Sequence, residues 1–184
     1  MGKLAYIFFA EGFEEVEALS VVDILRRGGV TVEMISIDNK DYVTSSHNVT
    51  LKMDKHFNEI DKNAADIVIL PGGMPGTTNL AACKELTDLI KDYNSKNKRI
   101  AAICAAPTVF GGLGLLSGKK AICYPGMEDK LEGAIVTVQE VVTDGNITTS
   151  RGLGTAIPFG LELLALLESK ELSDKISNAI VFRQ

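Results

Sequence analysis

The sequence is poor in the residues that build disulfide frameworks and metal sites. Its 184 residues include three cysteines, two histidines and no tryptophan. The cysteines, at positions 83, 104 and 123, are odd in number and lack paired motif spacing, so we expect reduced thiols rather than disulfides or a zinc site. Because His47 and His56 are the only histidines and neither lies close to a cysteine, we expect no metal site.

Long apolar runs and clusters of basic charge are also missing. No window approaches the roughly 20 apolar residues of a membrane helix. The first residues run into a short apolar strand without a cleavage-site pattern, so we expect a cytoplasmic protein with no membrane partner. The net charge is −5 and the basic residues are scattered, which argues against a nucleic-acid partner.

Strand patterns alternate with helix patterns along the chain. Wholly apolar runs are typical of strands in a parallel sheet that is covered on both faces. Strands are predicted at residues 4–9, 31–37, 65–70, 99–103 and 120–123, a short hairpin insertion at 42–44 and 49–51, and a second hairpin at 138–143 and 146–149. Helices are predicted from about residue 14 to 27 and at 83–97, 108–116 and 156–167. We therefore expect a single domain over residues 1–184, an α/β fold with a doubly wound, mostly parallel sheet and helices on both faces.

Cys104 stands where the apolar run 99–103 ends and small residues begin. Ala105, Ala106 and Pro107 follow it, a pattern that predicts a strand leading directly into a helix. The N–H groups and partial positive charge of a helix N-terminus favour a thiolate and lower the pKa of the thiol. Small neighbours allow a sharp turn that exposes the sulfur, as in the nucleophile elbow of serine hydrolases. Cys104 alone is equally compatible with a buried cysteine that packs as a small hydrophobe, and we interpret Cys83 and Cys123 as structural.

Glu17 lies on the apolar stripe of the first predicted helix. Helical spacing aligns it with Val21 and Ile24, so its carboxyl group faces the sheet. Burial raises the pKa of a carboxyl group and favours a protonated form that donates a hydrogen bond near neutral pH. Glu14 and Glu15, in contrast, are typical first-turn acids that the helix dipole stabilises.

Two further segments follow predicted strands, where ligands bind in doubly wound sheets. Gly72 and Gly73 offer backbone N–H groups without side-chain shielding, as an oxyanion site requires, although a tight turn explains the same pair. Arg151 lies just before the last long apolar helix, where it and the helix N-terminus predict a site for a small anion. A dinucleotide site is not expected, because Ile157 stands where its fingerprint requires a third glycine.

Four segments in this order resemble the ThiJ/PfpI superfamily, and within it the branch of the Parkinson-disease protein (DJ-one). They are residues 11–17, 70–73, 101–107 and 149–155, and the resemblance covers essentially the whole chain. It implies a flavodoxin-like sandwich that is usually a homodimer. It also implies that Cys104 is the family cysteine, that Glu17 is its protonated partner, and that oxyanion-type donors lie at Gly72, Gly73 and Ala105.

Three positions depart from the pattern of that superfamily. Tyr124 stands where mammalian members carry a histidine near the thiol; we expect it to close the pocket or donate a hydrogen bond. Ala105 stands where protease-like members have a histidine, so no imidazole is placed to protonate a leaving amine and we do not expect a protease. His47 replaces an arginine that relatives often carry.

The resemblance implies an enzyme that acts on small reactive dicarbonyls without a cofactor, as relatives described as glyoxalases and deglycases do. In this hypothesis the Cys104 thiolate adds to the aldehyde of methylglyoxal, and Glu17 shuttles a proton between carbon and oxygen until lactate is released. The alternative is a redox sensor or stress-response chaperone, in which Cys104 is oxidised to a sulfinate that protonated Glu17 stabilises. A nucleotide- or flavin-binding protein would be supported by the fold alone.

Overall fold

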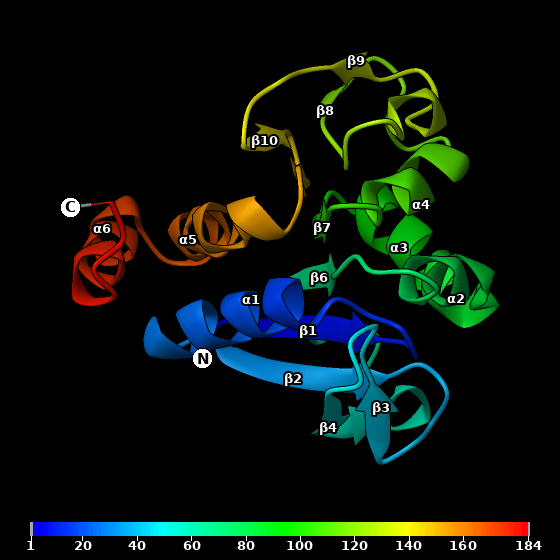
Figure 1. Ribbon diagram of the computed structural model, residues 1–184, viewed down its shortest axis with the longest axis horizontal. Helices are drawn as coiled ribbons and strands as arrows, with labels where there is room; N and C mark the ends of the chain where they lie inside the picture. The colour runs from blue at the N-terminus through cyan, green and yellow to red at the C-terminus, as the bar shows by residue number, and fades with distance from the viewer. Residues whose placement is uncertain (1, 184) are drawn as a thin grey trace.

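The computed structural model describes residues 2–183, and a seven-stranded sheet runs through its centre (Figure 1). The strand order is β10-β11-β7-β6-β1-β2-β5. The strands are β1 (Leu4–Phe9), β2 (Thr31–Ser36), β5 (Lys55–His56), β6 (Ile67–Leu70), β7 (Arg99–Ile103), β10 (Val141–Asp144) and β11 (Ile147–Ser150). Neighbouring strands are parallel except in the β10–β11 hairpin. The predicted doubly wound, mostly parallel sheet is confirmed.

Helices cover both faces of this sheet. One face carries α1 (Glu15–Arg27), α5 (Ala156–Leu167) and α6 (Lys170–Ala179); the other carries α2 (Gly76–Ala82), α3 (Lys84–Ser95) and α4 (Pro107–Gly112). Because successive side chains of a strand point to opposite faces, β1 contributes to both cores. Its Ile7 and Phe9 pack with α1 and α5, whereas Tyr6 and Phe8 pack with α3. Within residues 2–183, no helix combines the length and apolar character needed to cross a membrane.

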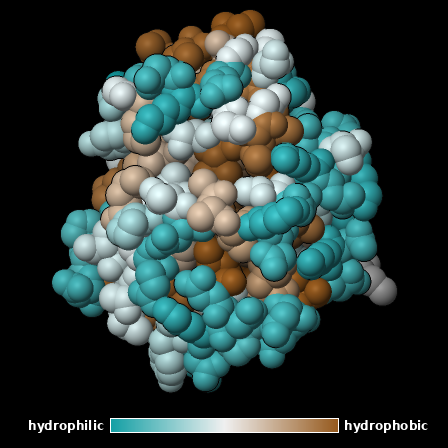
Figure 2. Space-filling view, turned by 90° about the vertical axis from the view of Figure 1, so that its right-hand side faces the viewer, coloured by the Kyte–Doolittle hydropathy of each residue, from teal (hydrophilic) through white to brown (hydrophobic). Residues whose placement is uncertain are grey.

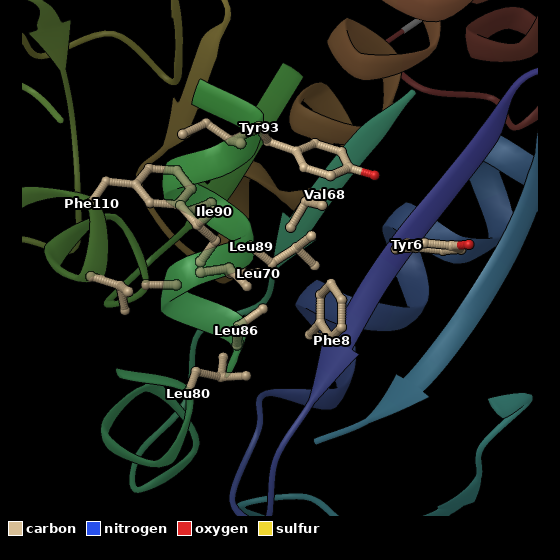
Figure 3. Packing of buried hydrophobic residues seen from close by; sticks show 14 of the residues in the cluster. Tyr6, Phe8, Val68, Leu70, Leu80, Leu86, Leu89, Ile90, Tyr93 and Phe110 are labelled. Carbon is tan, nitrogen blue, oxygen red and sulfur yellow. The ribbon is translucent and has the colours of Figure 1, made fainter. Parts of the chain in front are cut away.

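Figure 3 shows the core between α3 and the sheet, where side chains from the helix meet those of β1 and β6. The two tyrosines of this core are almost fully buried, and both find hydrogen-bond acceptors. The Tyr6 hydroxyl donates to the Asp61 carbonyl at 3.0 Å, and the Tyr93 hydroxyl donates to the Ala65 carbonyl at 3.2 Å. Seen from outside, this side of the molecule is largely hydrophilic with smaller apolar areas (Figure 2).

The strand order creates a switch point between β1 and β6. From β1 the chain proceeds to β2 on one side, and the later strands β6 and β7 add on the other side. The connections that follow β1 and β6 therefore lead to different sides of the sheet, and open α/β sheets form their binding sites at the carboxyl ends of such strands. Near these strand ends the two connections are hydrogen-bonded to each other. The Glu14 N–H donates to the Gly72 carbonyl at 2.9 Å, and the Gly76 N–H donates to the Gly12 carbonyl at 3.1 Å.

Several elements differ from the sequence-based prediction. Helix α4 ends at Gly112 rather than at residue 116, because glycine is a poor helix former and Gly114 adopts a φ of +72°. The strand expected at 120–123 stays outside the main sheet. It is β8 (Lys120–Ala121), and it pairs with β9 (Ile135–Val136).

The remaining elements are short or amphipathic. The predicted insertion is confirmed as the antiparallel pair β3 (Tyr42–Thr44) and β4 (Thr50–Lys52). Helices α2 and α6 and strands β5 and β9 were not predicted. The 3-10 turns are Phe57–Glu59, Glu128–Lys130 and Leu153–Thr155.

Phe159 provides a test of the core under α5, since its side chain is fully buried. We expect Phe159→Ala to lower the free energy of unfolding by about 3–5 kcal/mol, because it removes buried apolar area and leaves a cavity. Urea denaturation measures the change. Val138→Ala is the control: Val138 is 87% exposed, so its truncation is expected to change stability by less than about 0.5 kcal/mol. Equal effects of the two variants would contradict the packing described here.

Candidate active site

Cys104 occupies a strained turn directly after β7. Its φ is +65°, a left-handed conformation that non-glycine residues rarely adopt. The Cys104 N–H donates to the Ser150 carbonyl of β11 at 3.0 Å, and its own carbonyl accepts the Tyr124 N–H at 2.7 Å. The residue is thus held from both sides by main-chain hydrogen bonds. This geometry matches the sharp turn expected from the small residues that follow, and it leaves Cys104 half-buried.

Glu17 reaches the same place from helix α1. The residue is 1% exposed, and Val21 and Ile24 are buried on the same helix face, as the helical spacing predicted. Its Oε2 atom accepts the Gly72 N–H at 2.9 Å, and its carboxyl group is hydrogen-bonded to the Cys104 thiol. The buried carboxyl therefore lies between the glycine loop after β6 and the sulfur.

The two loop glycines have different roles. The Gly72 N–H is engaged by Glu17, so this residue does not serve as the oxyanion donor expected from the sequence. The Gly73 and Ala105 N–H groups instead lie near the Cys104 sulfur, where they lower the pKa of the thiol against the larger effect of burial. Gly73 has a φ of +90°, and a Cβ there would lie 2.4 Å from the Glu14 nitrogen, so only glycine fits.

The ionisation of the pair differs from the simplest expectation for Cys104. Burial raises the pKa of Glu17 to about 7, as predicted in direction. Burial, followed by the negative charge of Glu17, raises the pKa of Cys104 to about 12, so the predicted lowering of the thiol pKa is wrong for this state. Helix α4 contributes little against these effects, because it spans six residues and begins at Pro107, three positions beyond the sulfur-bearing residue.

With one proton on the pair, these pKa values place that proton on the sulfur, so a thiolate forms only when the proton moves to Glu17. When the proton resides on Glu17, the repulsion that raises the thiol pKa disappears, and the carboxyl donates a hydrogen bond to the sulfur. The N–H groups of Gly73 and Ala105 then stabilise the negative sulfur.

Tyr124 and Arg151 share a pocket whose lining does not include Cys104. Both line a pocket of about 290 Å³ together with Pro125, Leu153 and Thr155. A Cβ on Gly152 would lie 3.5 Å from the Tyr124 ring, so the ring lies over this glycine. Tyr124 is 51% exposed. Within residues 2–183 the Arg151 side chain forms no hydrogen bond or ion pair. Residues 152–155 separate it from helix α5, so the predicted anion site would depend on the arginine more than on the helix N-terminus.

Gly12 is a residue of the site that was not predicted from the sequence. Its φ is +83°, and a Cβ there would lie 2.4 Å from Cδ of Pro75. Its carbonyl accepts the Gly76 N–H, which joins the loop after β1 to the loop after β6. The available signal was a glycine in the short loop between β1 and α1.

The sequence of this chain is similar to those of one known protein family. The model of the DJ-1/PfpI family matches residues 3–166. Protein DJ-1 homolog B of Arabidopsis thaliana is 39% identical over 98% of the chain, which spans 42% of that longer relative. Protein dj-1beta of Drosophila melanogaster is 35% identical, and 98% of each sequence is covered. A Caenorhabditis elegans relative named glutathione-independent glyoxalase DJR-1.2 is 31% identical over 90% of this chain and 89% of its own length.

Solved structures show the same fold. A structure described as oxidized DJ-1 of Toxoplasma gondii superposes with a TM-score of 0.95 at 34% identity, and all of both chains is covered. Because the family model covers most of the chain and the Drosophila melanogaster relative aligns over nearly its full length, this protein belongs to the DJ-1/PfpI family.

Proposed function

We propose that the protein is a glutathione-independent enzyme of the glyoxalase or deglycase type, which converts small dicarbonyls such as methylglyoxal to hydroxy acids such as lactate. The observation that carries this proposal is the buried Glu17 carboxyl hydrogen-bonded to the sulfur of Cys104. A nucleophile beside a proton carrier is the minimal equipment for this chemistry. The name of the Caenorhabditis elegans relative supports the same assignment.

The first step forms a carbon–sulfur bond. The Cys104 thiolate adds to the aldehyde carbon, and the carbonyl oxygen takes the proton from Glu17 to give a hemithioacetal. The oxygen that becomes negative is bonded to the carbon beside the sulfur, within reach of the Gly73 and Ala105 N–H groups that lie near that sulfur. Such fixed donors stabilise developing negative charge without reorganisation.

The second step moves a hydrogen between the two carbons. The Glu17 carboxylate removes the proton from the former aldehyde carbon to give an enediolate. Glu17 then returns this proton to the neighbouring carbon, and the hydroxyl proton moves to the other oxygen, which gives a lactoyl thioester. Water hydrolyses this thioester, which releases lactate and restores the thiol. The overall reaction adds one water to methylglyoxal, and no metal or redox cofactor enters the scheme. The deglycase variant would release the same acid from early adducts on proteins or nucleotides.

Peptide hydrolysis does not fit the side chains around Cys104. Ala105 follows the cysteine, and both histidines are engaged elsewhere. His47 lies against Glu15 at 3.1 Å, and His56 lies against Asp41 at 2.9 Å. No imidazole is therefore placed to protonate an amine leaving group.

A redox sensor or stress-response chaperone is the second candidate. The same Glu17 carboxyl, when protonated, would donate a hydrogen bond to the oxygen of an oxidised Cys104. The solved structure of the Toxoplasma gondii relative is described as oxidized DJ-1.

The proposal includes a cytoplasmic homodimer. Val16 and Leu19 of α1 are 43% and 36% exposed, and Ile157 at the start of α5 is 36% exposed. Apolar side chains on two adjacent helices are a reasonable surface for a second copy of the chain.

Activity depends on both members of the pair. We expect Cys104→Ser and Glu17→Gln each to lower lactate formation from methylglyoxal at least about 100-fold. The first variant removes the nucleophile, and the second removes the proton carrier. The rate of the wild-type protein should rise as the pH increases through about 7, because only one proton then remains on the pair. The assay measures lactate without glutathione or metal. Cys83→Ser is the matched control and should retain activity; absence of lactate from freshly reduced wild-type protein would refute the proposal.

Oxidation separates the two candidates. If Cys104 is the nucleophile, peroxide treatment should abolish turnover in proportion to the fraction of sulfinate at Cys104, measured by mass spectrometry of the intact chain and its peptides. A fully oxidised protein that still turned over methylglyoxal would contradict the nucleophilic role. Oxidation-dependent chaperone activity in a protein without turnover would favour the sensor.

Glu17 is expected to lower stability at neutral and alkaline pH. Its pKa is about 7 in the folded protein and 4.5 in its ordinary state, so burial of the carboxylate destabilises the fold increasingly as pH rises from 4.5 to 7. We therefore expect Glu17→Gln to be more stable than the wild type by about 3 kcal/mol at pH 8 and nearly equal to it at pH 4. Denaturant unfolding at both values measures this difference. The exposed Glu168→Gln is the control and should change stability by less than about 0.5 kcal/mol. A Glu17→Gln effect equal at both pH values would contradict the buried ionisation.

A further inference from the structure

A second cluster of titratable side chains lies outside the cysteine site. It consists of Glu14 and Glu15, at the start of α1, and His47, in the turn between β3 and β4. The His47 Nδ1 atom is 3.1 Å from Oε1 of Glu15 and 3.6 Å from Oε2 of Glu14. One nitrogen and two carboxylate groups from distant parts of the sequence therefore converge on one point.

The two carboxylates are largely withdrawn from solvent without a permanent cation. The Glu14 and Glu15 side chains are 11% and 15% exposed. Within residues 2–183, neither forms an ion pair with a lysine or arginine, and His47 is the basic group that faces both. Two nearly buried negative charges opposite one imidazole leave an excess of negative charge. This arrangement favours a bound cation.

Hydrogen bonds hold the turn that carries His47 in place, and its Ser46 hydroxyl also donates to Oε2 of Glu14 at 3.2 Å and lies 3.2 Å from Nδ1 of His47. The Ser46 N–H donates to the Phe13 carbonyl at 2.8 Å, which ties the turn to the segment before α1. The Ser45 hydroxyl oxygen accepts the N–H groups of His47 at 3.3 Å and Val49 at 3.1 Å. The ligand atoms are thus positioned by the fold, which lowers the cost of assembling a metal site.

We propose that Glu14, Glu15 and His47 bind a divalent transition-metal ion such as Zn²⁺. Zinc binds nitrogen and carboxylate oxygen at about 2.0–2.2 Å in a tetrahedron, which places neighbouring ligand atoms about 3.3 Å apart. The separations of 3.1 and 3.6 Å from Nδ1 to the two carboxylates bracket that value. An imidazole ligand favours a transition metal over Mg²⁺ or Ca²⁺. The ion would replace the proton on Nδ1. Because the His47 side chain is 65% exposed, water could reach the ion and fill its fourth coordination position.

Calorimetric titration with zinc chloride tests the site. The titration uses the full chain with Cys83 and Cys104 replaced by serine, because these two half-buried thiols would also bind zinc. We expect one zinc ion per chain, and we expect His47→Gln and Glu15→Gln each to weaken binding at least tenfold. His56→Gln is the matched control, since His56 also lies beside two carboxylates, Asp41 at 2.9 Å and Glu59 at 3.6 Å.

The result that overturns the proposal is equally specific. Absence of binding at millimolar zinc, binding unchanged by both His47→Gln and Glu15→Gln, or binding lost in His56→Gln would each refute the site. Circular dichroism without metal checks that every variant is folded, and the two separate variants keep the test valid if one of them is not. The outcome is independent of the proposed enzyme activity, because the readout is metal binding in a protein without the Cys104 thiol.

Discussion

Three segments approach one another at Gly72 so closely that no side chain fits between them. A Cβ on this residue would lie 2.6 Å from Cβ of Cys104 and 2.6 Å from Oε2 of Glu17. The missing side chain allows the Gly72 N–H to reach the carboxylate, and the carboxylate to reach the sulfur. The parallel pairing of β6 with both β1 and β7 brings these segments together, so the sheet order and the chemistry depend on the same contact.

The buried pair works against the stability of the fold. An ionised carboxyl in this position is desolvated, and the left-handed conformation of Cys104 adds strain on the order of 1–3 kcal/mol. The surrounding main-chain hydrogen bonds and the packed cores on both sides of β1 compensate for this cost. A buried charge and a strained backbone at one place in an otherwise well-packed protein are characteristic of functional sites.

Periodicity in the sequence predicted most of the sheet and the burial of Glu17. Strands β1 and β6 at the centre of the sheet are continuous apolar runs, and Glu17 falls in register with Val21 and Ile24. Patterns of this kind do not report tertiary distances. They could not show that Glu17 takes the Gly72 N–H, that its charge raises the thiol pKa, or that His47 meets Glu14 and Glu15. Helix α4 was predicted too long because apolar residues continue beyond Gly112, while the glycines end the helix.

The strand order also determines when the reactive pair can exist. During synthesis, Glu17 and Gly72 leave the ribosome before Cys104, and β7 has to add to β6 before the sulfur meets the acid. A nascent or partly unfolded chain therefore carries an ordinary thiol with an ordinary pKa. Assembly of the central strands therefore raises the pKa of Cys104, and a labelling reagent that reacts with thiolates would distinguish folding intermediates from the native protein by their faster labelling.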